Sequence, residues 1–135
     1  MNWENLKEEI RDLGFETDEI FEEYESVIIN ACNRAMKVIR HTIIARHEDY
    51  FPDYFDIEYN TLVDYTPITV DTTDDTVIEI PEKLEVLLPL LASHYVWLDD
   101  DQVKSMLYWN EYDDLKNQLE FDIASPRRCI IDGGF

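Results

Sequence analysis

The chain has 135 residues, a length typical of one domain, and 45 % apolar and 13 % aromatic residues, enough for a packed core. Its formal net charge is −20, from 31 acidic and 11 basic residues. This balance argues against a generic basic surface for nucleic acid or anionic membrane, because both ligands require clustered Lys and Arg.

Neither a membrane span nor a disulfide framework is expected. No stretch approaches the roughly 18 uncharged apolar residues that a span requires. The N-terminal residues lack the basic and apolar regions of a signal peptide. Cys32 and Cys129 match neither a disulfide pattern nor a metal motif, so we expect free thiols and synthesis in the cytoplasm.

Two helices are predicted near the N-terminus. Apolar residues at helical spacing indicate a first helix over residues 2–13, and Gly14 is expected to end it in a left-handed conformation. Thr17 is expected to cap a long amphipathic helix over residues 18–48, whose apolar residues recur at steps of three and four.

Two further patterns mark this long helix. Its first half is rich in Glu and its second half in Lys, Arg and His, an order that complements the helix dipole. Ile29, Ile43 and Ile44 lie off the main apolar stripe and form a second, partly apolar face. Because two-sided burial is unusual in a small chain, we predict that these three residues form a subunit interface.

The middle of the chain is predicted to be less regular. Residues 50–65, rich in Tyr, Phe and Asp, are expected to form a loop. Two β-prone runs, 68–70 and 77–80, flank a polar turn and predict a β-hairpin near 66–80. The acids within 71–75 lack the pattern of a calcium loop, so we expect a solvated hairpin tip.

The C-terminal half is predicted to contain an α-hairpin and an arm. Pro89 is expected to begin an apolar, central helix that ends at Leu98. The acidic turn 99–101 then caps a last helix over about 101–121. Residues 125–135 show no helical period and are predicted to be extended.

The expected fold is therefore mainly α. A small helical bundle over residues 1–124 contains the long amphipathic helix and the short β-hairpin insertion. An extended C-terminal docking arm follows over residues 125–135.

No pattern predicts catalysis, a cofactor or a metal site. Acidic pairs are numerous, but none is accompanied by a second catalytic signal. His41 and His47 are six positions apart on one helix and face different directions, and His94 is expected to be packed and hydrogen-bonded. Cys32 is expected to be buried and inert. We therefore expect a protein that is not an enzyme and acts through its surfaces.

Residues 78–120 resemble the head–tail connector (adaptor) family of tailed bacteriophages. The similar features are an Ile-Pro-Glu sequence at 80–82 and a Leu-Leu-Pro sequence at 87–89 that leads into an apolar helix. An acidic turn at 99–101 and a second helix with Tyr-Trp-Asn-Glu-Tyr at 108–112 complete the pattern.

The resemblance implies a structural virion protein at the head–tail interface, made in the host bacterial cytoplasm. Its copies would form a dodecameric, homo-oligomeric ring on the portal protein and contact a stopper or tail-completion protein. Genomic DNA would pass through an acidic lumen without specific binding. The resemblance also implies that the C-terminal arm engages the portal, through Arg127, Arg128, Cys129, Ile130, Ile131 and Phe135.

Two alternatives stay open. The chain could be an acidic DNA mimic that inhibits a nucleic-acid-processing enzyme. Its acids gather at 18–25, 71–75 and 99–101, however, where helix caps and turns account for them. It could also be another phage neck component, a stopper or tail-completion protein, a class usually richer in strand.

Overall fold

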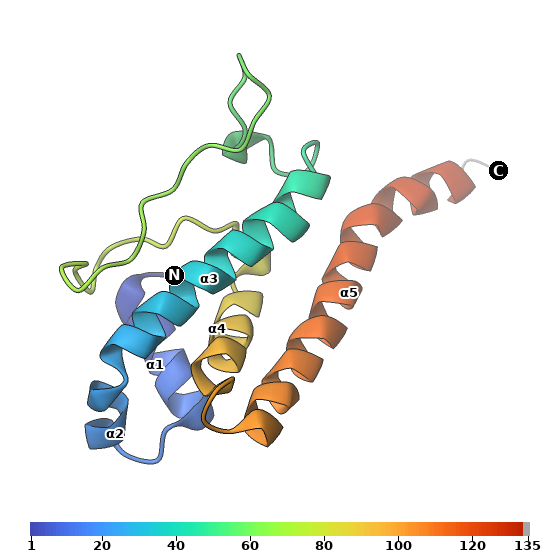
Figure 1. The fold of residues 1–135 in the computed structure, drawn as a ribbon. Helices are drawn as coiled ribbons and strands as arrows, with labels where there is room; N and C mark the ends of the chain where they lie inside the picture. The colour runs from blue at the N-terminus through green and yellow to red at the C-terminus, as the bar shows by residue number, and fades with distance from the viewer. Residues whose placement is uncertain (134–135) are drawn as a thin grey trace.

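The structure, a computed structural model, describes the backbone of residues 1–133 and the side chains of residues 1–124. It confirms the mainly helical bundle (Figure 1). Five α-helices and three short 3-10 helices occur in the described residues: α1 (Trp3–Gly14), α2 (Asp18–Glu23), α3 (Glu25–Thr42), η1 (Ile44–Arg46), η2 (Pro52–Tyr54), η3 (Glu82–Leu84), α4 (Leu87–Trp97) and α5 (Gln102–Gly133).

Helix α4 is the centre of the bundle, as predicted. It packs against α1, α3 and α5, and all its residues except Leu90 and Tyr95 are buried. Each fully buried Leu on such a helix contributes about 1.5–3 kcal/mol to folding. Pro89 lies in the first turn of α4, where the missing N–H costs no helical hydrogen bond.

Helix α1 ends by a different mechanism from the one predicted. Gly14 is its last residue, and no glycine in the described residues has a positive φ. The carbonyl oxygens of Leu13 and Gly14 instead accept hydrogen bonds from Tyr108 Oη and Lys104 Nζ of α5. Side chains of another helix therefore satisfy the carbonyls that a left-handed glycine would otherwise help to cap.

The long amphipathic helix is divided at Tyr24. This residue leaves the helical region (φ −94°, ψ 10°), so α2 and α3 are separate helices. The Tyr24 hydroxyl donates to Asp100 Oδ2 at 2.7 Å. The predicted N-cap is confirmed, because Thr17 Oγ1 accepts from the Ile20 N–H at 3.3 Å.

The predicted β-hairpin near 66–80 is wrong, since no strand occurs in the part of the chain that the structure describes. The Asn33 side chain of α3 donates to Ile68 O at 2.8 Å and accepts from the Ile68 N–H at 2.9 Å. At the other arm, the Ile78 N–H donates to Met1 O at 3.1 Å. The backbone groups of each arm therefore hydrogen-bond to a different part of the chain, and the two arms do not form a β-ladder with each other.

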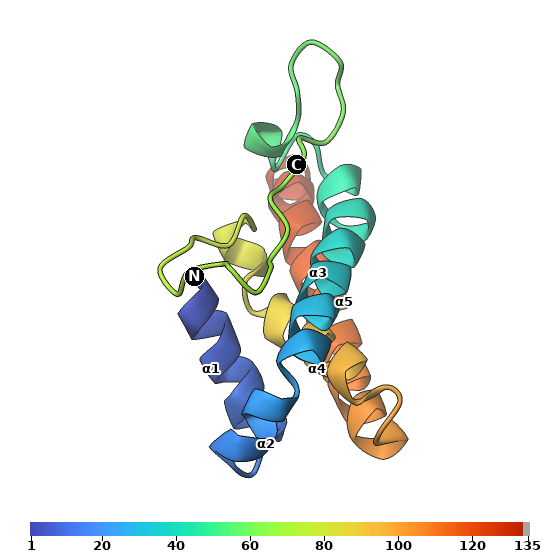
Figure 2. The same cartoon turned by 60° about the vertical axis from the view of Figure 1, so that its left-hand side comes forward.

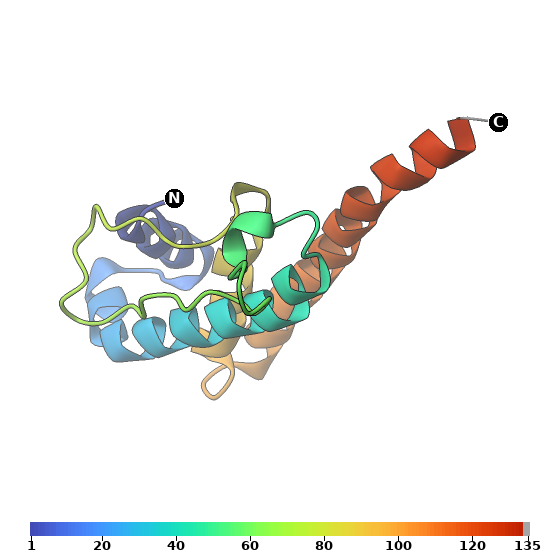
Figure 3. The same ribbon diagram turned by 90° about the horizontal axis from the view of Figure 1, so that it is seen from above.

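The predicted extended arm over 125–135 is also wrong for its described backbone, because α5 continues to Gly133. A proline removes one backbone hydrogen bond and often ends a helix, yet here helix lies on both sides of Pro126. The predicted cap of this helix is confirmed, since Asp101 Oδ1 accepts from the Lys104 N–H at 3.1 Å. The far half of α5 projects beyond the other helices (Figure 3).

Residues 50–65 form a protruding loop (Figure 2). Its two sides meet at one antiparallel bridge between Phe55 and Leu62, and Asn60 at the tip has a φ of 53°. Ile57 and Tyr59 at the tip are 100 % and 70 % exposed. Among the described residues, no helix is both long and apolar enough to cross a membrane.

Candidate interaction surfaces

The buried polar residues join helices. His94 Nδ1 lies 2.8 Å from Ser105 Oγ and 3.0 Å from Ser105 O, and Ser105 Oγ also lies 2.8 Å from His94 O. The prediction of a packed, hydrogen-bonded histidine is confirmed, and the contact locks α4 to α5. Cys32 is fully buried, and this burial raises the pKa of its thiol, so the side chain stays protonated, as expected.

The acidic turn 71–75 is held by one of its own side chains and by Lys7 of α1. Thr73 Oγ1 donates to Asp75 Oδ1 at 2.7 Å, and Lys7 Nζ donates to Asp74 Oδ1 at 2.7 Å. Within the described residues, no group of three or more His, Cys, Asp or Glu side chains is placed to hold a metal ion.

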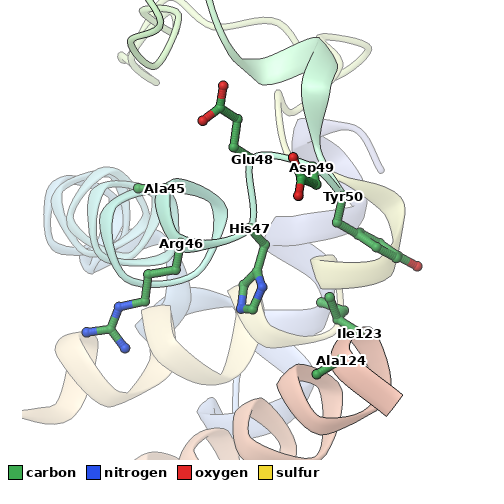
Figure 4. Close-up of a pocket in the computed structure, with 8 residues that line it drawn as sticks. All are labelled: Ala45, Arg46, His47, Glu48, Asp49, Tyr50, Ile123 and Ala124. Atoms are coloured by element: carbon green, nitrogen blue, oxygen red, sulfur yellow. The ribbon is translucent and has the colours of Figure 1, made fainter. Parts of the chain in front are cut away.

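A cleft of about 490 Å³ lies between residues 45–50, which include the end of η1, and α5 (Figure 4). His47 points across it toward α5, where His47 Nε2 lies 3.2 Å from Glu120 Oε2. The other oxygen of this carboxylate, Glu120 Oε1, lies 3.5 Å from Lys116 Nζ. Glu120 thus links α5 to the segment that follows η1, and this contact fastens the start of the projecting part of α5 to the bundle.

Arg40 anchors the protruding loop to α3. Its side chain is buried, and Nη2 donates to Val63 O. The guanidinium also lies 5.0 Å from the centre of the Tyr65 ring, and the Tyr65 hydroxyl donates to Asn33 O at 3.2 Å. Burial raises the pKa of Tyr65, while the Arg40 charge lowers it. One buried cation therefore holds the base of the loop.

The predicted subunit interface needs correction. Ile29, Ile43 and Ile44 are 8 %, 0 % and 0 % exposed, so they do not form an exposed apolar face. They belong to the same core as residues 68, 78 and 80 of the irregular segment. The hydrophobic pattern correctly indicated burial on two sides, but the residues that cover the second side belong to the same chain and not to another subunit.

The predicted portal-docking residues lie outside the described side chains. The backbone from Arg127 to Ile131 is helical, and Phe135 is outside the described backbone. Their role in binding a portal stays a prediction.

The outward face of α3 is basic. Asn30, Arg34, Lys37 and His41 follow one another at steps of four, three and four, and all are exposed. Residues 26–47 contain four Lys and Arg and no Asp or Glu. The sequence revealed these cations, but only the structure separates exposed Arg34 and Lys37 from buried Arg40. We call the four exposed residues the α3 basic face.

The outward face of α5 combines apolar side chains with two amides and one carboxylate, Asp114. Four exposed large apolar side chains of α5 lie near one side of the helix, and Asn110 and Asn117 lie on the same side. Periodicity alone does not show which face of this helix meets the bundle. The four are Val103, Met106, Leu107 and Phe121. With the two asparagines they make up the α5 outer face.

No protein-family model, curated protein or solved structure matches the chain.

Proposed function

We propose that the chain is a structural adaptor of the phage head–tail connector, which docks on the portal as a ring and links the head to stopper or tail proteins. The observation that carries this proposal is the α4–α5 hairpin. The resemblance falls on the helix that organises the bundle and on a partner helix that continues past the bundle as a projecting rod.

The α5 outer face supports this role. Val103, Leu107 and Phe121 expose more than half of their surface and lie on one side of a single helix. Exposed apolar side chains gathered on one helix face are typical of contacts between proteins. Between them lie Asn110 and Asn117, whose amides can hydrogen-bond to a partner, and Asp114, which adds one negative charge to this side of the helix.

The acidic charge suits a DNA conduit. Phosphates bind to clustered cations and are repelled by carboxylates, so an acidic wall lets DNA slide. The same charge makes identical copies repel one another, and we therefore expect the ring to assemble on the portal rather than spontaneously.

Two features weigh against the alternatives. A DNA mimic presents phosphate-like charge to a cationic groove, and the α3 basic face would meet that groove unfavourably. Stopper and tail-completion proteins are usually rich in β-strands, whereas this chain is mainly helical.

The test is to combine the full-length protein with the portal protein of the same phage and to examine the complex by cryo-electron microscopy and native mass spectrometry. A closed dodecameric ring on the portal is expected. Leu107→Asp is expected to weaken ring formation, whereas Val70→Asp changes a residue that is also exposed but lies off the α5 outer face. A protein that stays monomeric with the portal and captures a nuclease would refute the proposal.

A further inference from the structure

The α3 basic face carries charge that its own fold does not use. Arg34 and Lys37 form no ion pair with any residue of the described part. The Arg34 guanidinium instead lies 4.1 Å from the centre of the Tyr95 ring on α4. Stacking of this kind fixes the position of the guanidinium plane and leaves N–H groups at its edge for a carboxylate.

The helix dipole accounts for only part of this face. The favourable interaction of cations with a helix C-terminus falls off within about one turn. His41 lies in the last turn of α3, which ends at Thr42, but Arg34 lies about two turns earlier. The two permanent charges therefore point to a partner rather than to the stability of the helix.

The complementary surface lies on the same chain. Residues 16–25, which include α2, contain six Asp and Glu and no Lys or Arg. All six carboxylates are exposed. The only ion pair from this group in the described residues joins Asp18 to Arg11 at 3.8 Å. We call Glu19 and Glu23, which are four residues apart on one side of α2, the α2 acidic face.

We infer that the α3 basic face of one copy binds the α2 acidic face of a second copy. In a ring, each copy gives its basic face to one neighbour and its acidic face to the other, so every contact joins unlike charges. The inference rests on the proposed function for the ring itself, and it names the contact that overcomes repulsion between copies of charge −20.

Duplex DNA is the weaker candidate for this face. A phosphate backbone spans several helical turns, so it would also approach the carboxylates on both sides of α3. Residues 1–25 contain ten Asp and Glu, and residues 48–85 contain twelve. A second copy can present the α2 acidic face alone, and its acidic and basic residues lie in separate segments, so it can avoid the carboxylates near α3.

Charge reversal tests the contact. Arg34→Glu with Lys37→Glu is expected to lower the yield of portal-bound ring at least about ten-fold, since like charges would then meet. Glu19→Lys with Glu23→Lys is expected to do the same. A one-to-one mixture of the two double variants restores unlike contacts and is expected to recover the wild-type yield. Arg46→Glu with Lys83→Glu, a matched change in net charge at two exposed residues outside both faces, is expected to leave ring formation intact.

Zero-length cross-linking provides an independent readout. A carbodiimide joins Lys37 Nζ to a carboxylate only when the two groups are in contact. In a mixture of ¹⁴N- and ¹⁵N-labelled full-length protein, mixed-isotope peptides that join Lys37 to Glu19 or Glu23 are expected.

The outcomes separate this inference from the proposed function. A ring that forms normally with both double variants overturns the contact and leaves the adaptor role standing. Mixed-isotope cross-links without a ring support the contact and refute the adaptor role. Absence of these cross-links, or binding of a 30-base-pair duplex that Arg34→Glu with Lys37→Glu abolishes, overturns the inference.

Discussion

Gly14→Ala is expected to destabilise the protein, although alanine is the better helix former. In a helix, replacement of glycine by alanine gains about 0.5–1 kcal/mol. At this position a Cβ atom would lie 2.6 Å from Trp97 Nε1 and 3.2 Å from Lys104 Cε. The indole packs against both the Phe15 and the Tyr24 rings, at centroid distances of 4.9 and 5.4 Å, so it has little room to move.

The two effects can be compared in magnitude. Overpacking a close-packed site costs about 1–3 kcal/mol, and displacement of Trp97 also disturbs the Lys104 ammonium 3.8 Å from the ring centroid. Subtraction of the propensity gain leaves a net loss of about 0–2.5 kcal/mol, with a midpoint of about 1 kcal/mol. In a domain of this size, each kcal/mol lowers the Tm by about 3–6 °C.

Urea unfolding followed by circular dichroism measures this loss directly. The midpoint is expected to fall with little change in the m-value, because the surface exposed on unfolding stays the same. Asn117→Ala, at an exposed interior position of α5, is the matched control and is expected to gain a few tenths of a kcal/mol. A Gly14→Ala protein that is more stable than wild type would show that Trp97 does not occupy the position described here.

Three further changes test the buried and partly buried polar groups. Ser105→Ala is expected to cost about 1–2 kcal/mol, because His94 loses a buried partner, and faster hydrogen exchange at the α4–α5 turn would show it. Arg40→Met is expected to release the loop from its contact at Val63 O, so that limited proteolysis cuts within 50–65 while α3 stays protected. Partial burial and neighbouring carboxylates raise the pKa of Glu9, so its charge opposes folding at neutral pH. Glu9→Gln is therefore expected to raise the urea midpoint slightly at pH 7, because solvent screens this exposed site, and the gain disappears as pH falls and Glu9 becomes protonated.

The features that sequence analysis predicted correctly depend on nearby residues. Thr17 and Asp101 cap their helices through side chains three residues from the bonded N–H, so the local pattern was sufficient. The apolar sequence of α4 likewise reports its own burial, because a helix that is apolar on all sides has no solvent face.

The features that were missed depend on distant residues. Tyr24 interrupts the long helix while its hydroxyl bonds to Asp100, a residue 76 positions away. The two β-prone runs do not pair because Asn33 and Met1 occupy their backbone groups. The cations of the α3 basic face were visible in the sequence. Which of them are exposed and able to bind a partner depends on the fold, which buries Arg40 and exposes Arg34 and Lys37. Hydrophobic period and propensity contain none of this information.

Net repulsion and local attraction predict an unusual salt dependence for assembly. Repulsion between copies of charge −20 acts over distances comparable with the Debye length, about 30 Å at 0.01 M salt and about 8 Å at 0.15 M. The contact between Arg34 or Lys37 and a carboxylate acts at a few ångströms and is screened much less. Moderate salt should therefore remove the repulsion before it weakens the ion pairs.

Native mass spectrometry or light scattering of adaptor and portal across a salt series is expected to show the highest yield of ring at intermediate salt. A steady decline from the lowest salt would mean that attraction already dominates at long range, and a steady rise would mean that apolar contacts such as the α5 outer face, rather than ion pairs, hold the copies together.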